Sequence, residues 1–287
     1  MKIKKLTTTA LAALAGLAFV APSAKALTYS DGDLLLGFRA TGGSGSSTDY
    51  LIDLGAFTQF TLGGTYYSPG SAVTLSLSGI KTDLDNTYGS DWFTNATTNV
   101  LWGIAGTQKA KNTAPGNFTW ANTLFASAAT STNGGSTPWS TSTATAAGGP
   151  AGKIQSQGQL WATGTVTAND PAGVLQSSAG TTPNTWAYYQ QNGSGSTSTS
   201  AYSFWSGGIE AAVTDSSNKL DLYEMFPSGT GGAGAQAGTN YLGTFNLNSN
   251  GSIQYTAAVP EPSSIALSAV GIGALVLIAR RRRSVTA

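Results

Sequence analysis

Residues 241–256 read YLGTFNLNSNGSIQYT, and this stretch indicates most directly how the chain folds. Two short segments, 241–247 and 252–256, contain the aromatic and β-branched residues typical of strands. Between them, the polar sequence Asn-Ser-Asn-Gly at 248–251 is a favourable hairpin turn. The stretch therefore predicts an antiparallel β-hairpin.

Similar strand-like segments continue towards the amino terminus, separated by turns rich in Gly and Ser. Residues 73–78, VTLSLS, alternate strictly between apolar and polar side chains, as a half-buried strand should. The other segments are residues 33–39, 50–54, 100–104, 160–167, 202–205, 209–213 and 220–226. About ten short strands predict a mainly β fold, with a β-sandwich or jelly-roll-like body.

One segment follows a helical period instead. Ile80, Leu84 and Tyr88 are spaced by four residues, which predicts a short amphipathic helix over 80–88. Further short helices are predicted near 153–160 and 184–191. Tracts of Ser, Thr, Gly and Ala cannot bury enough apolar surface to offset their ordering entropy, so we expect surface loops there. These tracts are residues 126–149, 193–200 and 229–238.

Composition excludes several classes of chemistry. The 287 residues include no Cys and no His, so disulfides, thiolate nucleophiles, Cys or His metal sites and serine–histidine catalysis are all excluded. Between residues 27 and 259 the chain has 6 basic and 12 acidic side chains. This acidic body would repel phosphate, so no nucleic-acid partner is expected.

The amino-terminal 26 residues have the three parts of a secretory signal peptide in the correct order. A basic start with Lys2, Lys4 and Lys5 precedes an apolar helical stretch at 11–20. Small residues at Ala24 and Ala26 fit the signal peptidase, so cleavage is expected after Ala26. The implied partners are the Sec translocon and signal peptidase.

The carboxy-terminal 29 residues also have three parts. Two prolines bracket a glutamate and keep that segment extended, an apolar run at 265–279 follows, and four arginines end it. Fifteen helical residues rise about 22 Å, and the flanking serines and arginine stems bring the helix close to spanning a bilayer. The arginines would fix this end in the cytoplasm, with the body outside. The residues concerned are Val259, Pro260, Glu261, Pro262, Arg280, Arg281, Arg282 and Arg283.

This tail closely resembles the PEP-CTERM sorting domain of exopolysaccharide-producing Gram-negative bacteria. The resemblance implies cutting by an exosortase, a membrane-embedded cysteine transpeptidase-like enzyme. The chain then divides into a signal peptide (1–26), an extracytoplasmic body (27–258) and a sorting tail (259–287). The resemblance implies a membrane-anchored precursor with a periplasmic body, and a product at the cell surface or outside the cell. A tail that anchors without being cut is the alternative.

Carboxylate pairs are the candidates for an activity. Glycoside hydrolysis needs two acids, and Ca²⁺ needs oxygen ligands, although no complete Ca²⁺ loop is found in the sequence. Since close acid pairs arise by chance, we expect solvated turn and helix residues, no catalytic site, and no metal or cofactor. A secreted hydrolase remains the alternative function. The pairs are Asp31 with Asp33, Asp83 with Asp85, and Glu210 with Asp215 or Asp221.

Seven tryptophans are a second candidate feature. Trp102 and Trp161 lie in strand-like segments and are expected in the core. Other aromatics are better candidates for exposure, since Trp139 lies in a Ser-Thr-Pro loop and Trp186 lies beside two tyrosines. Exposed rings could stack on sugars, as in carbohydrate-binding β-sandwiches. These possible carbohydrate-binding residues are Trp139, Trp186, Tyr188 and Tyr189. The sequence thus favours a non-enzymatic surface or matrix protein that contacts exopolysaccharide in biofilms.

Overall fold

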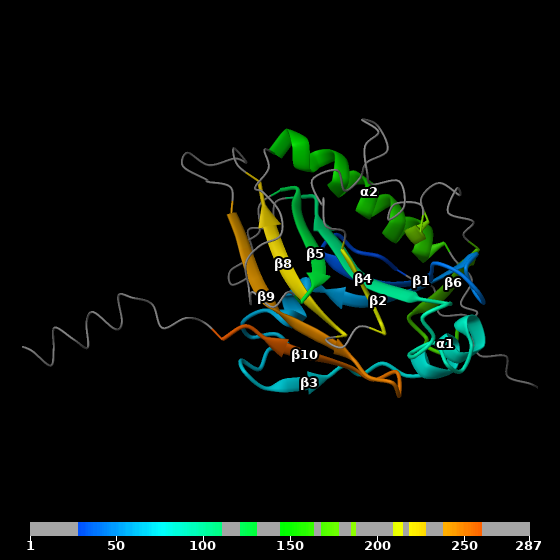
Figure 1. The fold of residues 1–287 in the computed structure, drawn as a ribbon. Helices are drawn as coiled ribbons and strands as arrows, with labels where there is room; N and C mark the ends of the chain where they lie inside the picture. The colour runs from blue at the N-terminus through cyan, green and yellow to red at the C-terminus, as the bar shows by residue number, and fades with distance from the viewer. Residues whose placement is uncertain are drawn as a thin grey trace, which may run out of the picture.

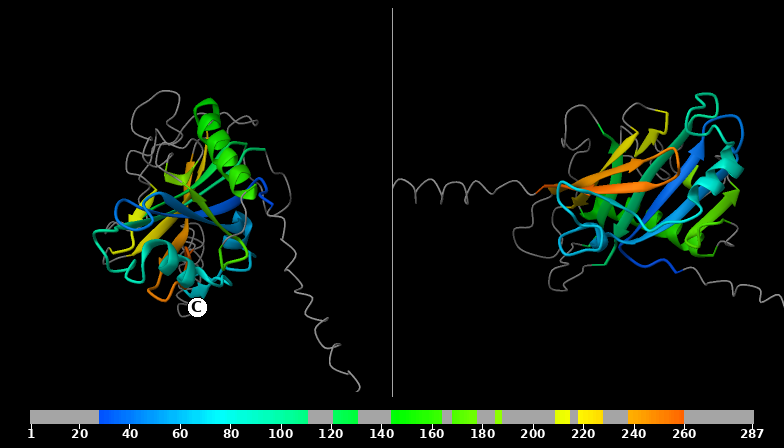
Figure 2. Two further views of the ribbon diagram at one scale, coloured as in Figure 1. Left: turned by 90° about the vertical axis from the view of Figure 1, so that its right-hand side faces the viewer. Right: turned by 90° about the horizontal axis from the view of Figure 1, so that it is seen from below.

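The computed structural model describes residues 28–110, 121–130, 144–163, 168–177, 185–187, 209–214, 218–227 and 238–259. In these residues, ten strands form one antiparallel sheet in the order β3-β10-β9-β8-β5-β4-β1-β2-β6, and β7 pairs with β4. The sheet curls, and helix α2 (Ala144–Ala162) lies across one face of it (Figures 1 and 2). The strands are β1 (Asp33–Ala40), β2 (Thr48–Ala56), β3 (Ala72–Thr74), β4 (Val100–Gln108), β5 (Thr123–Ala129), β6 (Gly173–Ser177), β7 (Glu210–Ala212), β8 (Lys219–Phe226), β9 (Gly238–Leu247) and β10 (Ile253–Ala257).

Strand β1 is buried on both faces, which explains its continuous apolar sequence. Leu34, Leu36 and Phe38 point to one side and join the larger apolar cluster, while Leu35 joins a second cluster on the other side. Alternate residues of a strand face opposite sides, so a run of leucines is what a central strand between two cores requires. The sheet therefore separates two hydrophobic cores.

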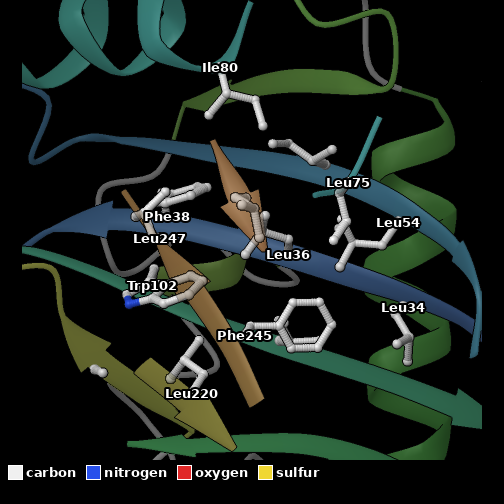
Figure 3. Close-up of a cluster of buried hydrophobic side chains, with 14 of the residues drawn as sticks. Leu34, Leu36, Phe38, Leu54, Leu75, Ile80, Trp102, Leu220, Phe245 and Leu247 are labelled. Carbon is white, nitrogen blue, oxygen red and sulfur yellow. The ribbon is translucent and has the colours of Figure 1, made fainter. Parts of the chain in front are cut away.

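The larger core fills the inside of the curl. Leu34, Leu36 and Phe38 meet Trp102 from β4 and Phe245 from β9, as Figure 3 shows. Helix α1 (Ile80–Tyr88) adds its buried apolar residues to the same cluster. Burying each large apolar side chain contributes about 1.5–3 kcal/mol, so this cluster is the main source of stability.

The second core lies between the sheet and α2. Ile154 and Trp161 of α2 pack with Leu124 and Ala126 of β5 in this cluster. The alanines of β5 leave room for the helix to approach the sheet. Ser127, between them, points to the opposite side and is fully buried, and its hydroxyl is bonded to the backbone of Ile104 and Ile209. Small residues in β5 thus serve helix–sheet packing.

Several sequence predictions are confirmed. The helix predicted over 80–88 is α1, with the same ends. The predicted hairpin is formed by β9 and β10, where Asn248 N donates to Ser252 O at 2.9 Å and Gly251 N donates to Asn248 O at 2.9 Å. Gly251 has φ 77°, a conformation that favours glycine. Trp102 and Trp161 are buried as expected.

Other predictions of elements are wrong. A β-sandwich would have two stacked sheets, but the described strands form one sheet. Strand β8 pairs with both β5 and β9, and so joins the strands β3, β10 and β9 to the rest of the sheet. The 126–149 tract is not a single loop, since it contains the end of β5 and the start of α2. Residues 160–162 end α2 rather than begin a strand, and of the predicted 73–78 segment only residues 73 and 74 lie in a strand, β3.

The predicted segments at 202–205 and 1–26 lie outside the described residues, as does the apolar run at 265–279. Within the described part of the chain, no helix has both the length and the apolar character needed to cross a membrane.

Candidate functional site

The sorting tail continues directly from β10, which is fixed on both of its edges. On one edge β10 pairs with β9, from Ile253 opposite Leu247 to Ala257 opposite Gly243. On the other edge it pairs with β3, from Gln254 opposite Thr74 onwards. The strand that precedes the tail is therefore an interior strand, although β3 beside it is short.

A bulge in β9 secures the last residues before the tail. The β8–β9 register shifts between Leu222 and Tyr223, which leaves Leu242 of β9 without a Cα partner on β8. The carbonyl oxygen of Leu242 accepts two hydrogen bonds, from Ala258 N at 2.9 Å and from the Tyr255 hydroxyl at 2.6 Å. The ordered ladder thus extends to residue 258.

The loop before β3 closes the other side of the same strand end. Gly70 N donates to Ala257 O at 3.3 Å, and Pro69 forms a parallel bridge with Ala257. Val259, two residues after Ala257, has 64% of its surface exposed. Figure 1 shows β10 ending at the edge of the molecule away from α1. The chain therefore leaves the fold at Val259, one residue before Pro260.

The described fold thus passes, with one exposed residue between, into a segment in which two prolines flank a glutamate. A family model described as the PEP-CTERM protein-sorting motif matches residues 258–283, so the tail of this chain is a PEP-CTERM motif. The match includes Pro260, Glu261, Pro262 and the four arginines, and it covers 26 of the 287 residues. No curated protein and no solved structure matches the chain.

This match confirms the resemblance seen in the sequence and supports a protein that is exported and sorted through a membrane-anchored tail. Its start at residue 258 coincides with the last backbone bond of the fold, from Ala258 N. Residues 260–262 and 280–283 lie outside the described residues, as do Ala24 and Ala26.

The predicted exposure of Trp186 is wrong, because its side chain is fully buried. The indole ring lies flat over Gly37 of β1, where a Cβ would overlap it, and beside Gly103 of β4. Its Nε1 donates to Glu210 Oε1 at 2.7 Å. Two glycines on neighbouring strands form the recess for the ring, which cannot present a face to a sugar. Trp139, Tyr188 and Tyr189 lie outside the described residues.

Glu210 belongs to a buried ion pair instead of a pair of acids. Its carboxylate accepts from Arg39 Nε at 2.9 and 3.0 Å and from Arg39 Nη2 at 2.6 Å, and the arginine side chain is 11% exposed. Such two-point contacts are the strongest form of Arg–carboxylate pairing. Asp221, the proposed partner of Glu210, instead accepts from the hydroxyls of Thr130 and Thr244.

The remaining candidate acids also have structural partners. Asp31 accepts from the backbone of Lys109 and Ala110 and from the Gln108 amide. Asp83 is buried, whereas Asp85 forms an exposed pair with Lys81. The structure therefore does not bring Asp83 and Asp85 together as a pair. Asp215 lies outside the described residues, and in the part described no group of three acids could hold a metal ion.

Asp83 organises a junction that sequence spacing does not reveal. Its carboxylate accepts from the Tyr50 hydroxyl at 2.8 Å, from Asn169 N at 2.8 Å and from Asp170 N at 3.1 Å. The buried Asp170 then accepts from Ser78 N at 2.9 Å, and burial raises the pKa of Asp170 above its usual range. These bonds fix α1 against residues 168–172, which are distant in the sequence.

Asp53 is an acid that no sequence prediction singled out. The pairing of β1 with β2 brings it near Asp33, and burial followed by repulsion from Asp33 raises the pKa of Asp53 to about 7. Burial also raises the pKa of Asp33. Acids with raised pKa values occur at functional sites and also in structural networks of buried groups.

We expect Asp53→Asn to stabilise the protein above pH 7. The folded state retains a proton that the unfolded carboxyl releases near pH 4, so stability falls as the pH rises from about 4 to 7. The amide avoids this loss and keeps the Oδ1 that accepts from Gly55 N. The gain at pH 8 should be about 2 to 4 kcal/mol in urea unfolding. The exposed Asp91→Asn is the matched control, and an equal effect of both changes at pH 8 would contradict the assignment.

Proposed function

We propose that this chain is a non-enzymatic surface or matrix protein, exported as a membrane-anchored precursor and released from its tail by an exosortase-type enzyme. After its signal peptide is removed, the body lies on the periplasmic side while the apolar run at 265–279 spans the inner membrane. The mature β domain then associates with the exopolysaccharide of the producing cell, at the surface or in a biofilm.

The observation that carries this proposal is the PEP-CTERM motif at residues 258–283, which begins where the fold ends. Because the ladder stops at Ala258 and Val259 is exposed, a membrane enzyme can reach the proline-flanked glutamate without unfolding β10. The low charge of the body, 9% charged residues over the whole chain, suits contact with neutral sugar hydroxyls.

Mass spectrometry of the protein from its native host should find an amino terminus at Leu27 and a carboxy terminus near Pro262. Deleting the host exosortase should leave the same amino terminus but an intact arginine cluster. Released protein that keeps Arg280–Arg283 in the wild-type host would exclude tail processing.

The protein isolated from its native host also distinguishes a matrix protein from a hydrolase. The processed protein should sediment with the polysaccharide of its producer and create no new reducing ends. New reducing ends that disappear with Asp53→Asn would instead establish a hydrolase based on the Asp33–Asp53 pair, whose raised pKa values favour that alternative.

A further inference from the structure

The surface around the exit of the tail is made by the turns that lead into β3. Residues 61–71 run beside the end of β10, as Figures 1 and 2 show in two directions. Gly70 donates to Ala257 O, and a Cβ on Gly70 would lie 3.4 Å from a methyl group of Val259. We call residues 61–71, 258 and 259 the tail-side surface.

A tight turn presents an apolar side chain on this surface. Gly64 N donates to Thr61 O at 2.8 Å and Gly63 has φ 85°, so Leu62 occupies the tip of a turn that favours glycine at its next position. Leu62 is 82% exposed, and it and Val259 are the large apolar side chains exposed in the described part of the chain. Turn tips usually carry polar residues, so this leucine is not explained by the turn itself.

The turn has a defined position relative to the core. Phe60, immediately before it, is fully buried, and its carbonyl oxygen accepts from the Tyr255 hydroxyl of β10 at 3.0 Å. Tyr66, shortly after it, stacks on the Phe60 ring with centroids 5.3 Å apart, and Tyr66 N donates to Gln59 O at 2.8 Å. Leu62 is therefore held outside the fold by contacts on both sides of the turn.

The segments that build this end of the molecule contain no charged residue. None occurs in the sequence between Asp53 and Lys81, or between Glu224 and Glu261. These two intervals contain the turns, β3, β9 and β10. An uncharged surface can approach lipid headgroups without losing the hydration of an ion, and tyrosines such as Tyr66 and Tyr67 are favoured at that depth.

The length of the tail keeps this surface close to the membrane. Five residues, 260–264, separate Val259 from the apolar run that begins at Ile265. Fully extended, the six steps between these two Cα atoms span at most about 22 Å.

We propose that, in the anchored precursor, the tail-side surface rests on the outer leaflet of the membrane and inserts Leu62 into its interface. This inference rests on the proposed function, because it requires the 265–279 helix to be in the bilayer. Lipid is the occupant because it surrounds that helix in every anchored molecule, whereas a processing enzyme contacts each chain once. The contact would orient β10 and its tail before cleavage.

A single introduced cysteine can be labelled specifically to test the contact, since the chain has no cysteine of its own. Leu62→Cys in the full-length precursor is labelled with an environment-sensitive fluorophore and reconstituted in vesicles of phosphatidylethanolamine and phosphatidylglycerol with headgroup-region quencher lipids. Asn86→Cys is the matched control, because residue 86 lies on α1, and α1 contacts Gly251, at the other end of β10.

We expect the label at position 62 to lose fluorescence to the quencher lipids and the label at position 86 to remain unquenched, because only an inserted segment reaches the headgroup region. Vesicle flotation is measured on the same samples to separate two failures. If the precursor floats but both labels behave alike, the surface contact is wrong while anchoring stands. If the precursor does not float, anchoring itself fails and the contact fails with it. Quenching at position 62 that appears only after an exosortase is added would assign the surface to the enzyme and overturn the proposal.

Discussion

Replacing Glu210 with alanine should lower the free energy of unfolding by about 3 to 5 kcal/mol, the usual cost of removing one partner of a buried ion pair. The Arg39 guanidinium would remain buried without its counter-charge, and Trp186 Nε1 would lose its acceptor. Equilibrium urea unfolding, followed by tryptophan fluorescence, measures this loss.

The exposed Lys81–Asp85 pair provides the matched control. Lys81→Ala removes an ion pair of the same type at the surface and should cost about 0.5 kcal/mol or less. Glu210→Gln keeps an oxygen for Trp186 Nε1, so its cost should lie between the two. A cost for Glu210→Ala no larger than that of Lys81→Ala would show that the buried pair contributes little to stability.

Asp83→Ala should have an effect of similar size, about 3 to 5 kcal/mol, because each buried donor left without a partner costs about 1 to 3 kcal/mol. The change leaves the Tyr50 hydroxyl and the backbone N–H groups of Asn169 and Asp170 without their acceptor. Besides urea unfolding, hydrogen exchange should show faster exchange of the α1 amides.

Tyr50→Phe separates the contributions of these donors. It removes one hydrogen bond from Asp83 without exposing any backbone group, so its cost should be about 1 kcal/mol. Equal costs for Tyr50→Phe and Asp83→Ala would mean that the bonds to residues 169 and 170 add nothing to stability.

Elements with a local signal could be predicted from the sequence. The four-residue spacing of Ile80, Leu84 and Tyr88 places one face of α1 in the core, and the predicted helix has the observed ends. The turn at 248–251 requires a positive φ at its last residue, and Gly251 meets that requirement. Both signals are confined to short segments, where backbone geometry alone determines the pattern.

Elements that depend on distant partners could not be predicted. Ala126 and Ala128 resemble a loop tract, but they form a strand because Ile154 and Trp161 of α2 cover them. Trp186 looks exposed among polar neighbours, and its recess is made by Gly37, far away in the chain. The environments of Asp53 and Asp83 could not be predicted either. They depend on which distant segments of the chain pack together, and not on the spacing of acids along the sequence.

The sorting motif was the most predictable feature, because its signal lies in one continuous stretch of sequence. Pro260, Glu261 and Pro262 and the four arginines were sufficient to indicate the family that the comparison then matched. What the linear motif does not show is how closely it follows the fold, and this depends on the bonds of Ala258 and Leu242.

The absence of a spacer after β10 also has a mechanical consequence. Any tension on a body tethered by its tail enters the domain at Ala258, directly after a strand that is bonded along both edges to β9 and β3. Load applied along such a strand is shared by two ladders at once. A pulling force on the tail would therefore have to slide both ladders together before the domain could begin to unravel.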